Sequence, residues 1–235
     1  MRVRPSQAAK ALTRLACHLH LPFYDSSMPT SHLLYLHGFR SSPQSVKAQK
    51  MARLMARDYP DIVWWCPQLP PSPRQAMREI MAAVSLWPSD KGFRNTGVIG
   101  SSLGGFYATW VAEKMNCRAV LLNPAVEPAR DLSQHIGEQT AWHNPKDRFF
   151  FAPEFVDELR ELHAGPIGSP QNYLAVIAKG DEVLDWREMT ARYTGVQLRL
   201  LEGGDHAISD FDDHLPAILN FLNVEKRPDL DSFPA

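Results

Sequence analysis

The segment 100–104, Gly-Ser-Ser-Leu-Gly, holds the serine in this chain that is best placed for nucleophilic chemistry. Its G-x-S-x-G spacing follows an apolar run at 96–99 that predicts a strand, and a helical pattern comes after it. Glycines let a sharp strand-to-helix turn pass close to its neighbours, which leaves the hydroxyl of Ser102 exposed. Ser101 becomes the nucleophile only if the turn shifts by one residue, which breaks the spacing. A serine used only to make a tight turn is the alternative.

A serine hydroxyl needs a base to remove its proton, and that base needs an acid to orient it. Asp181 and His206 each lie one short loop beyond an apolar run, at 173–178 and 197–201. In a doubly wound sheet such loops meet at the carboxyl ends of the strands. The order serine, acid, histidine is that of α/β-hydrolases. We therefore predict Ser102 as nucleophile, His206 as general base and Asp181 as the orienting acid.

Two other carboxylates compete with Asp181 for the acid role. Asp185 stands four residues further on, and Asp205 adjoins His206, so either one can supply or share the role. Asp181 is preferred to both. For His206, the alternative to catalysis is capping of the last helix.

The tetrahedral intermediate of acyl transfer needs hydrogen-bond donors for its negative oxygen. One predicted donor is the backbone N–H of Leu103, the residue after the nucleophile. A second is expected from the loop after the first strand, where His-Gly-Phe stands at 37–39, and it is assigned to the N–H of Phe39.

Alternating strand and helix patterns predict an α/β fold with a mostly parallel sheet of about six strands, covered by helices on both faces. Ser72 and Gln75 have the spacing of a capping box around Pro73. The predicted strands are 32–36, 62–66, 96–99, 118–122, 173–178 and 197–201, and the predicted helices are about 46–57, 72–87, 103–115, 186–193 and 215–222.

Residues 124–170 interrupt the alternation with proline, histidine and aromatic residues, including three phenylalanines at 149–151. A long excursion within a small domain predicts a cap-like insertion over a pocket. The alternative is that the phenylalanines only anchor an irregular loop. We expect a poorly ordered N-terminal extension at 1–28, the α/β-hydrolase domain at 29–224 and a C-terminal tail at 225–235.

The bulk composition excludes several function classes. A formal net charge of -1 creates no field that favours nucleic acid. The three cysteines, Cys17, Cys66 and Cys117, form no C-x-x-C pair, so we expect neither a disulfide framework nor a zinc site, and a cytoplasmic location. No apolar run approaches the roughly 20 residues that cross a bilayer. No nucleotide-binding glycine motif appears, so neither a metal nor an organic cofactor is expected.

Several ordered motifs together resemble the YqiA-like small bacterial esterases of the α/β-hydrolase superfamily. The likeness runs from about 29 to 222, whereas the leader at 1–27 and the middle segment at 131–170 depart from it. The resemblance implies a compact hydrolase acting on acyl esters, with the triad at Ser102, Asp181 and His206. The segments that carry it are 34–39 (Leu-Tyr-Leu-His-Gly-Phe), 41–43, 100–110, 123–126 (Asn-Pro-Ala-Val), 180–185 and 203–207.

These observations predict a serine carboxylesterase that forms an acyl-enzyme at Ser102 and acts on small-molecule esters, with short acyl chains favoured. A thioesterase or an acyltransferase would use the same triad. A protein of another class, a non-catalytic binding protein on a hydrolase scaffold, also fits the fold.

Overall fold

The computed structural model describes residues 29–88 and 93–226. The extension predicted for 1–28 and all but the first two residues of the tail predicted for 225–235 lie outside the described residues.

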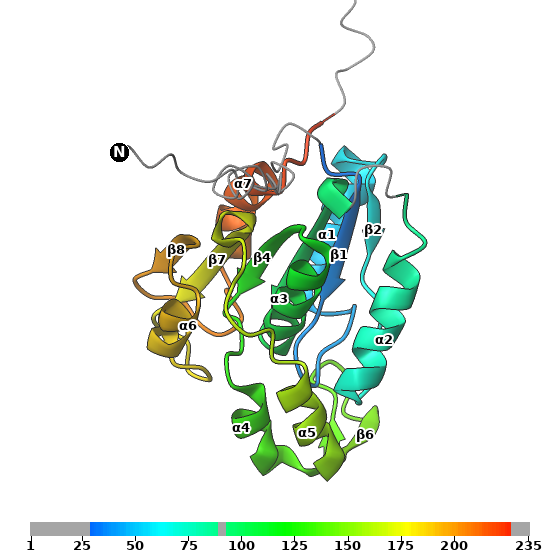
Figure 1. The fold of residues 1–235 in the computed structure, drawn as a ribbon, viewed down its shortest axis with the longest axis vertical. Coiled ribbons are helices and arrows are strands. Elements are labelled where there is room, and N and C mark those ends of the chain that lie inside the picture. Colours follow the sequence, from blue (N-terminus) through cyan, green and yellow to red (C-terminus); the bar gives the residue numbers. More distant parts are fainter. Residues whose placement is uncertain (1–28, 89–92, 227–235) are drawn as a thin grey trace, which may run out of the picture.

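A six-stranded sheet forms the centre of the molecule (Figure 1). Every neighbouring pair is parallel, in the order β2-β1-β3-β4-β7-β8, so the predicted parallel sheet is confirmed. The four inner strands are buried along their whole length, because helices cover both faces. The strands are β1 (His32–Leu36), β2 (Val63–Trp65), β3 (Thr96–Ser101), β4 (Arg118–Leu122), β7 (Tyr173–Ala178) and β8 (Gln197–Leu201).

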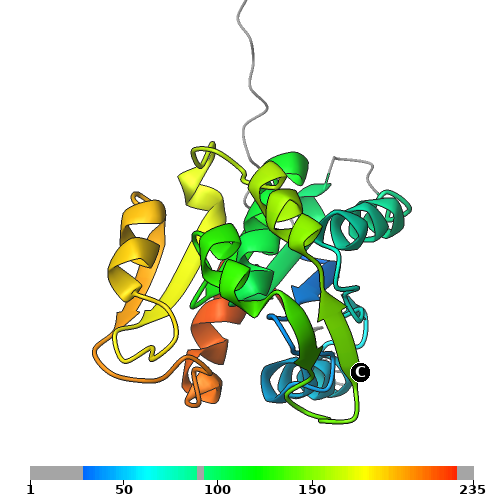
Figure 2. The same cartoon turned by 90° about the horizontal axis from the view of Figure 1, so that it is seen from below.

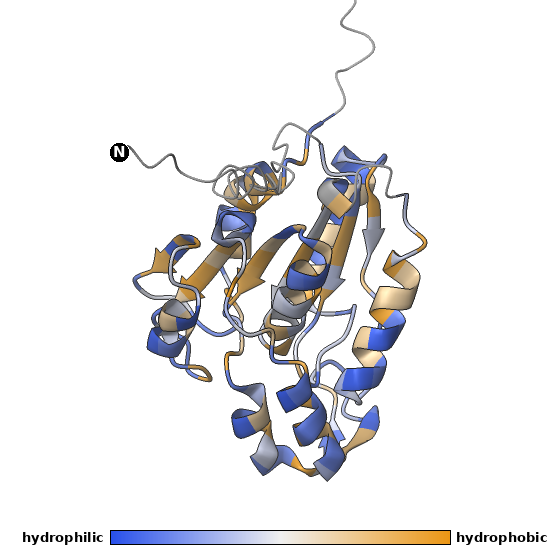
Figure 3. Ribbon diagram, viewed as in Figure 1, coloured by the Kyte–Doolittle hydropathy of each residue, from blue (hydrophilic) through white to orange (hydrophobic). Residues whose placement is uncertain are grey.

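Helices cover both faces of the sheet, as predicted. One buried cluster contains side chains of α2 (Pro73–Val84), α3 (Leu103–Met115) and α6 (Trp186–Arg192). The cluster on the opposite face contains side chains of α1 (Val46–Asp58) and α7 (Phe211–Phe221). Figure 3 shows the strands as mainly apolar and the helices as two-sided, with polar residues facing outward. Both long apolar surfaces of the sheet are therefore buried.

Two helix boundaries differ from the sequence prediction by more than one residue. α2 ends at Val84 rather than near 87, and α7 begins at Phe211, four residues before the predicted start. The first turn of α7 contains Asp212 and Asp213, which favour a helix N-terminus but do not contribute to an apolar pattern. At the start of α2, Ser72 accepts a hydrogen bond from the backbone N–H of Gln75 at 3.1 Å, which is one half of the predicted capping box. The Gln75 side chain does not complete the box, because it donates to Glu79 at 2.8 Å instead.

The segment between β4 and β7 forms a separate layer at the carboxyl ends of the strands (Figure 1). It contains an antiparallel hairpin in which Glu138 pairs with Phe150. The carboxylate of Glu158 accepts bonds from the Ser72 hydroxyl at 2.7 Å and the Arg74 N–H at 3.1 Å, which fixes this layer to α2. Its elements are α4 (Pro128–Leu132), β5 (Gly137–Thr140), β6 (Arg148–Phe151) and α5 (Pro153–Glu161); short 3₁₀ turns occupy Phe93–Asn95, Ser133–His135 and Pro170–Asn172.

Within 29–88 and 93–226, none of the helices combines the length and the apolar character required to cross a membrane. Cys66 and Cys117 are free thiols, and burial raises the pKa of each to about 12.

Candidate active site

Ser102 lies at the sharp turn between β3 and α3, with φ 57° and ψ -123°. A side chain is strained at this positive φ, which glycine adopts more readily. The two flanking glycines are required by space. A Cβ at Gly104 would lie 1.9 Å from the carbonyl oxygen of Leu36, and one at Gly100 would lie 2.1 Å from that of Gly104. The G-x-S-x-G spacing is therefore the spacing that this turn needs.

The backbone of Ser102 is fixed on both sides, whereas its side chain is free. Its N–H donates to the Leu122 carbonyl and its carbonyl accepts from the Ala125 N–H, both at 3.0 Å. Its hydroxyl makes no hydrogen bond within the described residues, and the side chain is partly exposed. Ser101 is buried. The exposed serine of the pair is thus the one that the motif selects.

Asp181 and His206 form a hydrogen-bonded pair, with Nδ1 of the imidazole 2.8 Å from Oδ2 of the carboxylate. The Asp181 side chain is fully buried, and its other oxygen accepts the N–H groups of Val183 and Leu184, each at 2.8 Å. The backbone N–H of His206 donates to the carboxylate of Glu182 at 2.9 Å. With Nδ1 engaged in this way, Nε2 is the nitrogen left for proton transfer.

The two competing carboxylates bind elsewhere. Asp185 caps α6, where its side chain accepts the N–H of Arg187 at 2.9 Å. Asp205 accepts the hydroxyl and the N–H of Ser209, at 2.6 and 3.0 Å, and these bonds lower its pKa. Among the three acids that the sequence offered, the structure pairs Asp181 with the imidazole.

Asn123 fixes the loop that carries His206, and the sequence prediction assigned it no role. Its side chain is fully buried, at φ 42°. Its Oδ1 accepts the N–H of Ala178 at 2.8 Å, and its Nδ2 donates to the carbonyls of Asp205 at 3.0 Å and His206 at 3.2 Å. The available signal was its position directly after β4, at the carboxyl edge of the sheet.

Lys47 is a second residue near this loop that the sequence did not indicate. Its ammonium group, on α1, donates to the backbone carbonyl of Ala207. Burial lowers its pKa to about 8, against the opposing effect of Asp205 and Asp181. The loop that carries His206 is therefore bound by Lys47 of α1 as well as by Asn123.

The loop after β1 lies against the serine. A Cβ at Gly38 would lie 3.6 Å from Oγ of Ser102. Phe39 follows Gly38 and Leu103 follows Ser102, and both line the same cavity. Neither of their backbone N–H groups donates a hydrogen bond within the described part of the chain. The two donors predicted for an oxyanion are thus close to the serine and unoccupied.

His37 supports this loop as a neutral side chain. Burial lowers its pKa, its Nε2 accepts the N–H of Leu69 at 3.1 Å, and its Nδ1 lies 3.0 Å from the carbonyl of Gly38. The imidazole therefore carries its proton on Nδ1 and connects the loop after β1 to the loop after β2.

The hairpin β5–β6 holds the other end of the same loop, and Figure 2 shows these segments together. Arg40, at φ 59°, donates from Nε to the Thr140 carbonyl at 2.6 Å, and its guanidinium lies 4.0 Å from the centre of the Trp142 ring. The N–H of Trp142 donates to the Arg40 carbonyl at 2.8 Å, and Oγ of Ser42 lies 3.1 Å from Nδ1 of His143. The loop after β1, which contains the predicted oxyanion donor, is therefore bound directly to the layer at the carboxyl ends of the strands.

A cavity of about 520 Å³ opens between these segments. Aromatic rings form one wall, since Phe39 meets Phe149 and Phe151 edge to face with centroids 5.7 and 5.3 Å apart. The lining residues are His37, Gly38, Phe39, Arg40, Ser41, Gln68, Leu69, Pro70, Pro71, Glu79, Leu103, Tyr107, Ala141, His143, Asp147, Arg148, Phe149 and Phe151.

A smaller hollow of about 360 Å³ lies along the loop from Lys179 to Arg187, and Asp181 is among its lining residues. Within the described ranges, histidine, cysteine and carboxylate side chains form no group of three or more that could hold a metal ion.

Comparison with known proteins places the chain among relatives of similar length. The model of the UPF0227 family, described as an uncharacterised protein family, matches residues 32–223. A UPF0227 protein from Serratia proteamaculans (strain 568) is 25% identical over 194 residues, which cover 82% of this chain and 99% of the relative.

Solved structures show similarity in fold. A putative hydrolase from Agrobacterium vitis S4 aligns with a TM-score of 0.61 at 18% identity, covering 83% of this chain and 91% of that one. An esterase from Pyrococcus furiosus aligns with a TM-score of 0.53 at 16% identity, covering 83% and 81%. These alignments confirm the predicted α/β-hydrolase fold.

Proposed function

We propose that this chain, which belongs to the UPF0227 family, is a serine hydrolase that cleaves acyl esters through an acyl-enzyme at Ser102. Membership confirms the resemblance to YqiA-like proteins that the motifs indicated. The proposal rests mainly on the free hydroxyl of Ser102 at a strained turn. This turn and the Asp181–His206 pair lie at the carboxyl ends of the strands of one sheet. The hydrolase and esterase names of the structural neighbours agree with this reaction class.

In the proposed reaction, Oγ of Ser102 attacks the ester carbonyl carbon as its proton passes to Nε2 of His206. The tetrahedral intermediate then collapses, and His206 returns the proton to the leaving alcohol. A water molecule attacks the acyl-enzyme with His206 again acting as base, which releases the acid and restores the serine. Asp181 keeps the Nδ1 proton in place and stabilises the imidazolium in both steps.

The backbone N–H groups of Phe39 and Leu103 are the proposed donors to the developing oxyanion. Both are free of partners among the residues that the structure describes. Donors of this kind add rate because they are already oriented before charge develops, and the loss of one costs about 10²–10³ in kcat. His37 and Arg40 hold the loop that presents Phe39.

The proposal covers acyl esters as a class and is not restricted to short chains. The cavity beside Ser102, of about 520 Å³, falls within the range of roughly 300–1,000 Å³ that holds drug-sized molecules. Thioesters would pass through the same acyl-enzyme, so rates with matched oxygen and sulfur esters decide between an esterase and a thioesterase.

Labelling with a fluorophosphonate tests the nucleophile without a choice of substrate. The purified chain is compared with Ser102→Ala and with the matched control Ser101→Ala, and the modified peptide is identified by mass spectrometry. We expect label on Ser102 in the wild type and in Ser101→Ala, and none in Ser102→Ala. A folded wild type that takes no label, or takes it at another serine, refutes the proposal and favours a binding protein on this fold.

A further inference from the structure

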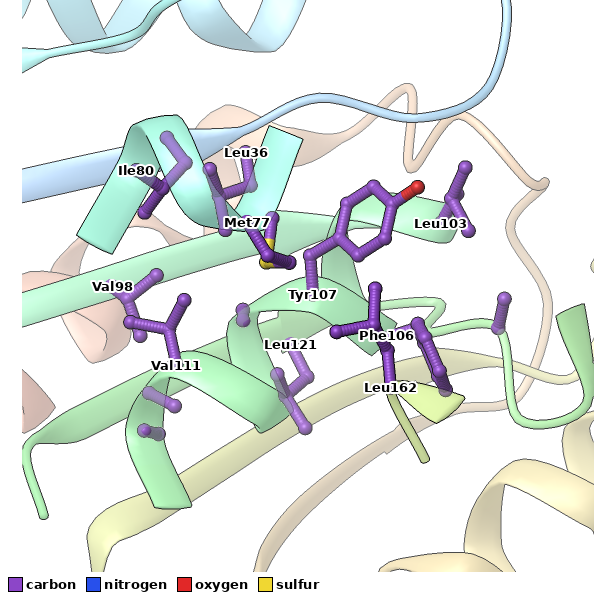
Figure 4. Close-up of a cluster of buried hydrophobic side chains, with 14 of the residues drawn as sticks. Leu36, Met77, Ile80, Val98, Leu103, Phe106, Tyr107, Val111, Leu121 and Leu162 are labelled. Carbon is purple, nitrogen blue, oxygen red and sulfur yellow. The ribbon is translucent and has the colours of Figure 1, made fainter. Parts of the chain in front are cut away.

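Tyr107 is a buried residue of the cavity wall whose hydroxyl has no partner. The side chain is 3% exposed and belongs to the core cluster of α3. In Figure 4 its ring lies among the clustered side chains, and its oxygen points out on the side of Leu103. Tyr107 lines the cavity, and its hydroxyl makes no hydrogen bond within residues 29–88 and 93–226. The ring is buried, whereas the hydroxyl is open to the cavity, so a bound ligand can place a hydrogen-bond acceptor against it.

Two other buried tyrosines show what the fold normally provides. The hydroxyl of Tyr193 lies 2.9 Å from Oγ1 of Thr109, and that of Tyr173 donates to the carboxylate of Glu113. Burial and the charge of Glu158 raise the pKa of Tyr107, so its phenol stays protonated and can donate. Tyr107 therefore presents a hydrogen-bond donor to the cavity.

The cavity wall is more apolar than polar, although the charged side chains of Arg40, Glu79, Asp147 and Arg148 also line it. Phe39, Phe149 and Phe151 form an aromatic surface, and Leu69 and two prolines extend it. A volume of about 520 Å³ accepts a group much larger than an acetyl. A ligand that matches this site has an apolar body with a hydrogen-bond acceptor on it.

The position of His206 indicates which half of an ester enters the cavity. The leaving alcohol must take its proton from His206, so it has to lie on the side of that residue. The residues that line the cavity come from the loops after β1 and β2, from α2, from the start of α3 and from the hairpin. Ser102, Asp181 and His206 are not among them, and the cavity adjoins the serine through its neighbours Gly38 and Leu103. The acyl group is the part of the ester that lies away from His206.

We propose that this cavity is the acyl-binding subsite, and that it selects bulky apolar acyl groups that carry a hydrogen-bond acceptor for the Tyr107 hydroxyl. This inference rests on the proposed acyl-ester hydrolysis at Ser102. Tyr107 is then a specificity-determining residue, which contacts the substrate and takes no part in proton transfer.

The test compares p-nitrophenyl esters that share one leaving group. The acyl groups are acetyl, 3-phenylpropanoyl and the three 3-pyridylpropanoyl isomers, which match the phenyl group in shape and add one acceptor nitrogen. In the wild type we expect a higher kcat/KM for phenylpropanoyl than for acetyl. We further expect at least one pyridyl isomer to exceed phenyl by about fivefold, the effect of one net hydrogen bond.

Tyr107→Phe removes only the donor, and the readout is the ratio of pyridyl to phenyl kcat/KM. We expect this ratio to fall to about one in Tyr107→Phe and to stay at the wild-type value in the control Tyr193→Phe, which alters a buried tyrosine outside the cavity. Fluorophosphonate labelling reports folding and the nucleophile independently of the acyl group.

Three outcomes separate the two proposals. A ratio that falls only in Tyr107→Phe supports the subsite. A wild type that labels and hydrolyses acetyl ester, but prefers neither the bulky nor the acceptor-bearing groups, overturns the subsite and leaves the proposed function standing. A folded wild type that neither labels nor hydrolyses any ester overturns both.

Discussion

Replacing Ser102 by glycine and by alanine measures the strain stored at the candidate nucleophile. Ser102 has φ 57° and ψ -123°, where a Cβ is unfavourable. A residue held in such a region costs on the order of 1–3 kcal/mol. Ser102→Gly relieves this cost, whereas Ser102→Ala keeps the Cβ and removes only the hydroxyl. Neither variant loses a cap bond, because the Ser102 side chain makes none to α3.

Glycine and alanine also differ at any helix N-cap, and in the entropy of the unfolded chain. Ser45 provides the matched control, since it is the N-cap of α1, has no side-chain cap bond and lies at an ordinary φ of -58°. The difference between Gly and Ala at Ser45 contains the capping and entropy contributions. Subtracting the Gly–Ala difference at Ser45 from the difference at Ser102 leaves the free-energy cost of backbone strain at Ser102.

The assay is urea unfolding of the four variants, with the free energy of unfolding compared at equal m-values. We expect glycine to be favoured at Ser102, relative to Ser45, by about 1–3 kcal/mol. A double difference of zero, or one that favours alanine, refutes the conclusion that the turn at Ser102 is strained. All four proteins must unfold in one cooperative transition for the comparison to count.

Three further predictions follow from the same site. Asp181→Asn removes the anion that orients His206 and should lower the rate of fluorophosphonate labelling on the order of 10⁴-fold, whereas Asp185→Asn should label like the wild type; equal loss in both would contradict the pairing. Gly104→Ala places a Cβ 1.9 Å from a β1 carbonyl and should cost about 3 kcal/mol or more in urea unfolding, and a variant of wild-type stability would be inconsistent with the close approach. Burial lowers the pKa of Lys47 from 10.5 to about 8, so between these pH values the folded chain binds fewer protons than the unfolded chain. The free energy of unfolding should therefore rise with pH in this range. Lys47→Met should lose this rise when unfolding is measured from pH 7.5 to 10, and an unchanged pH slope in the variant would contradict the prediction.

Much of the fold could be predicted from the sequence because the inner strands are buried on both faces. The predicted bounds of β1, β4 and β7 are those of the structure, since β7 is apolar throughout and β1 and β4 are apolar after their first residue. The edge strand β2 is shorter than its prediction of 62–66, because it pairs only with β1, over three residue pairs. β5, Gly-Glu-Gln-Thr, has no apolar alternation, so its pairing with β6 cannot be predicted from its own residues.

Part of the candidate site could likewise be predicted from the sequence, and part of it could not. Ser102, Asp181 and His206 could be placed by chain order, because each follows a legible strand. The roles of Asn123 and Arg40 depend on contacts between distant segments, such as the 100 residues between Arg40 and its partner in β5. No local pattern encodes such a contact.

The anchoring of the His206 loop by Asn123 has a consequence for local unfolding. β8, which leads into this loop, is a sheet edge with mostly exposed side chains, and amide protons of such strands exchange through low-energy openings. The loop, however, is bound to a fully buried side chain that follows β4, in the middle of the sheet. We therefore expect fraying of β8 to leave these anchors intact, so that the opening energy of the His206 loop is set by the centre of the sheet rather than by its edge.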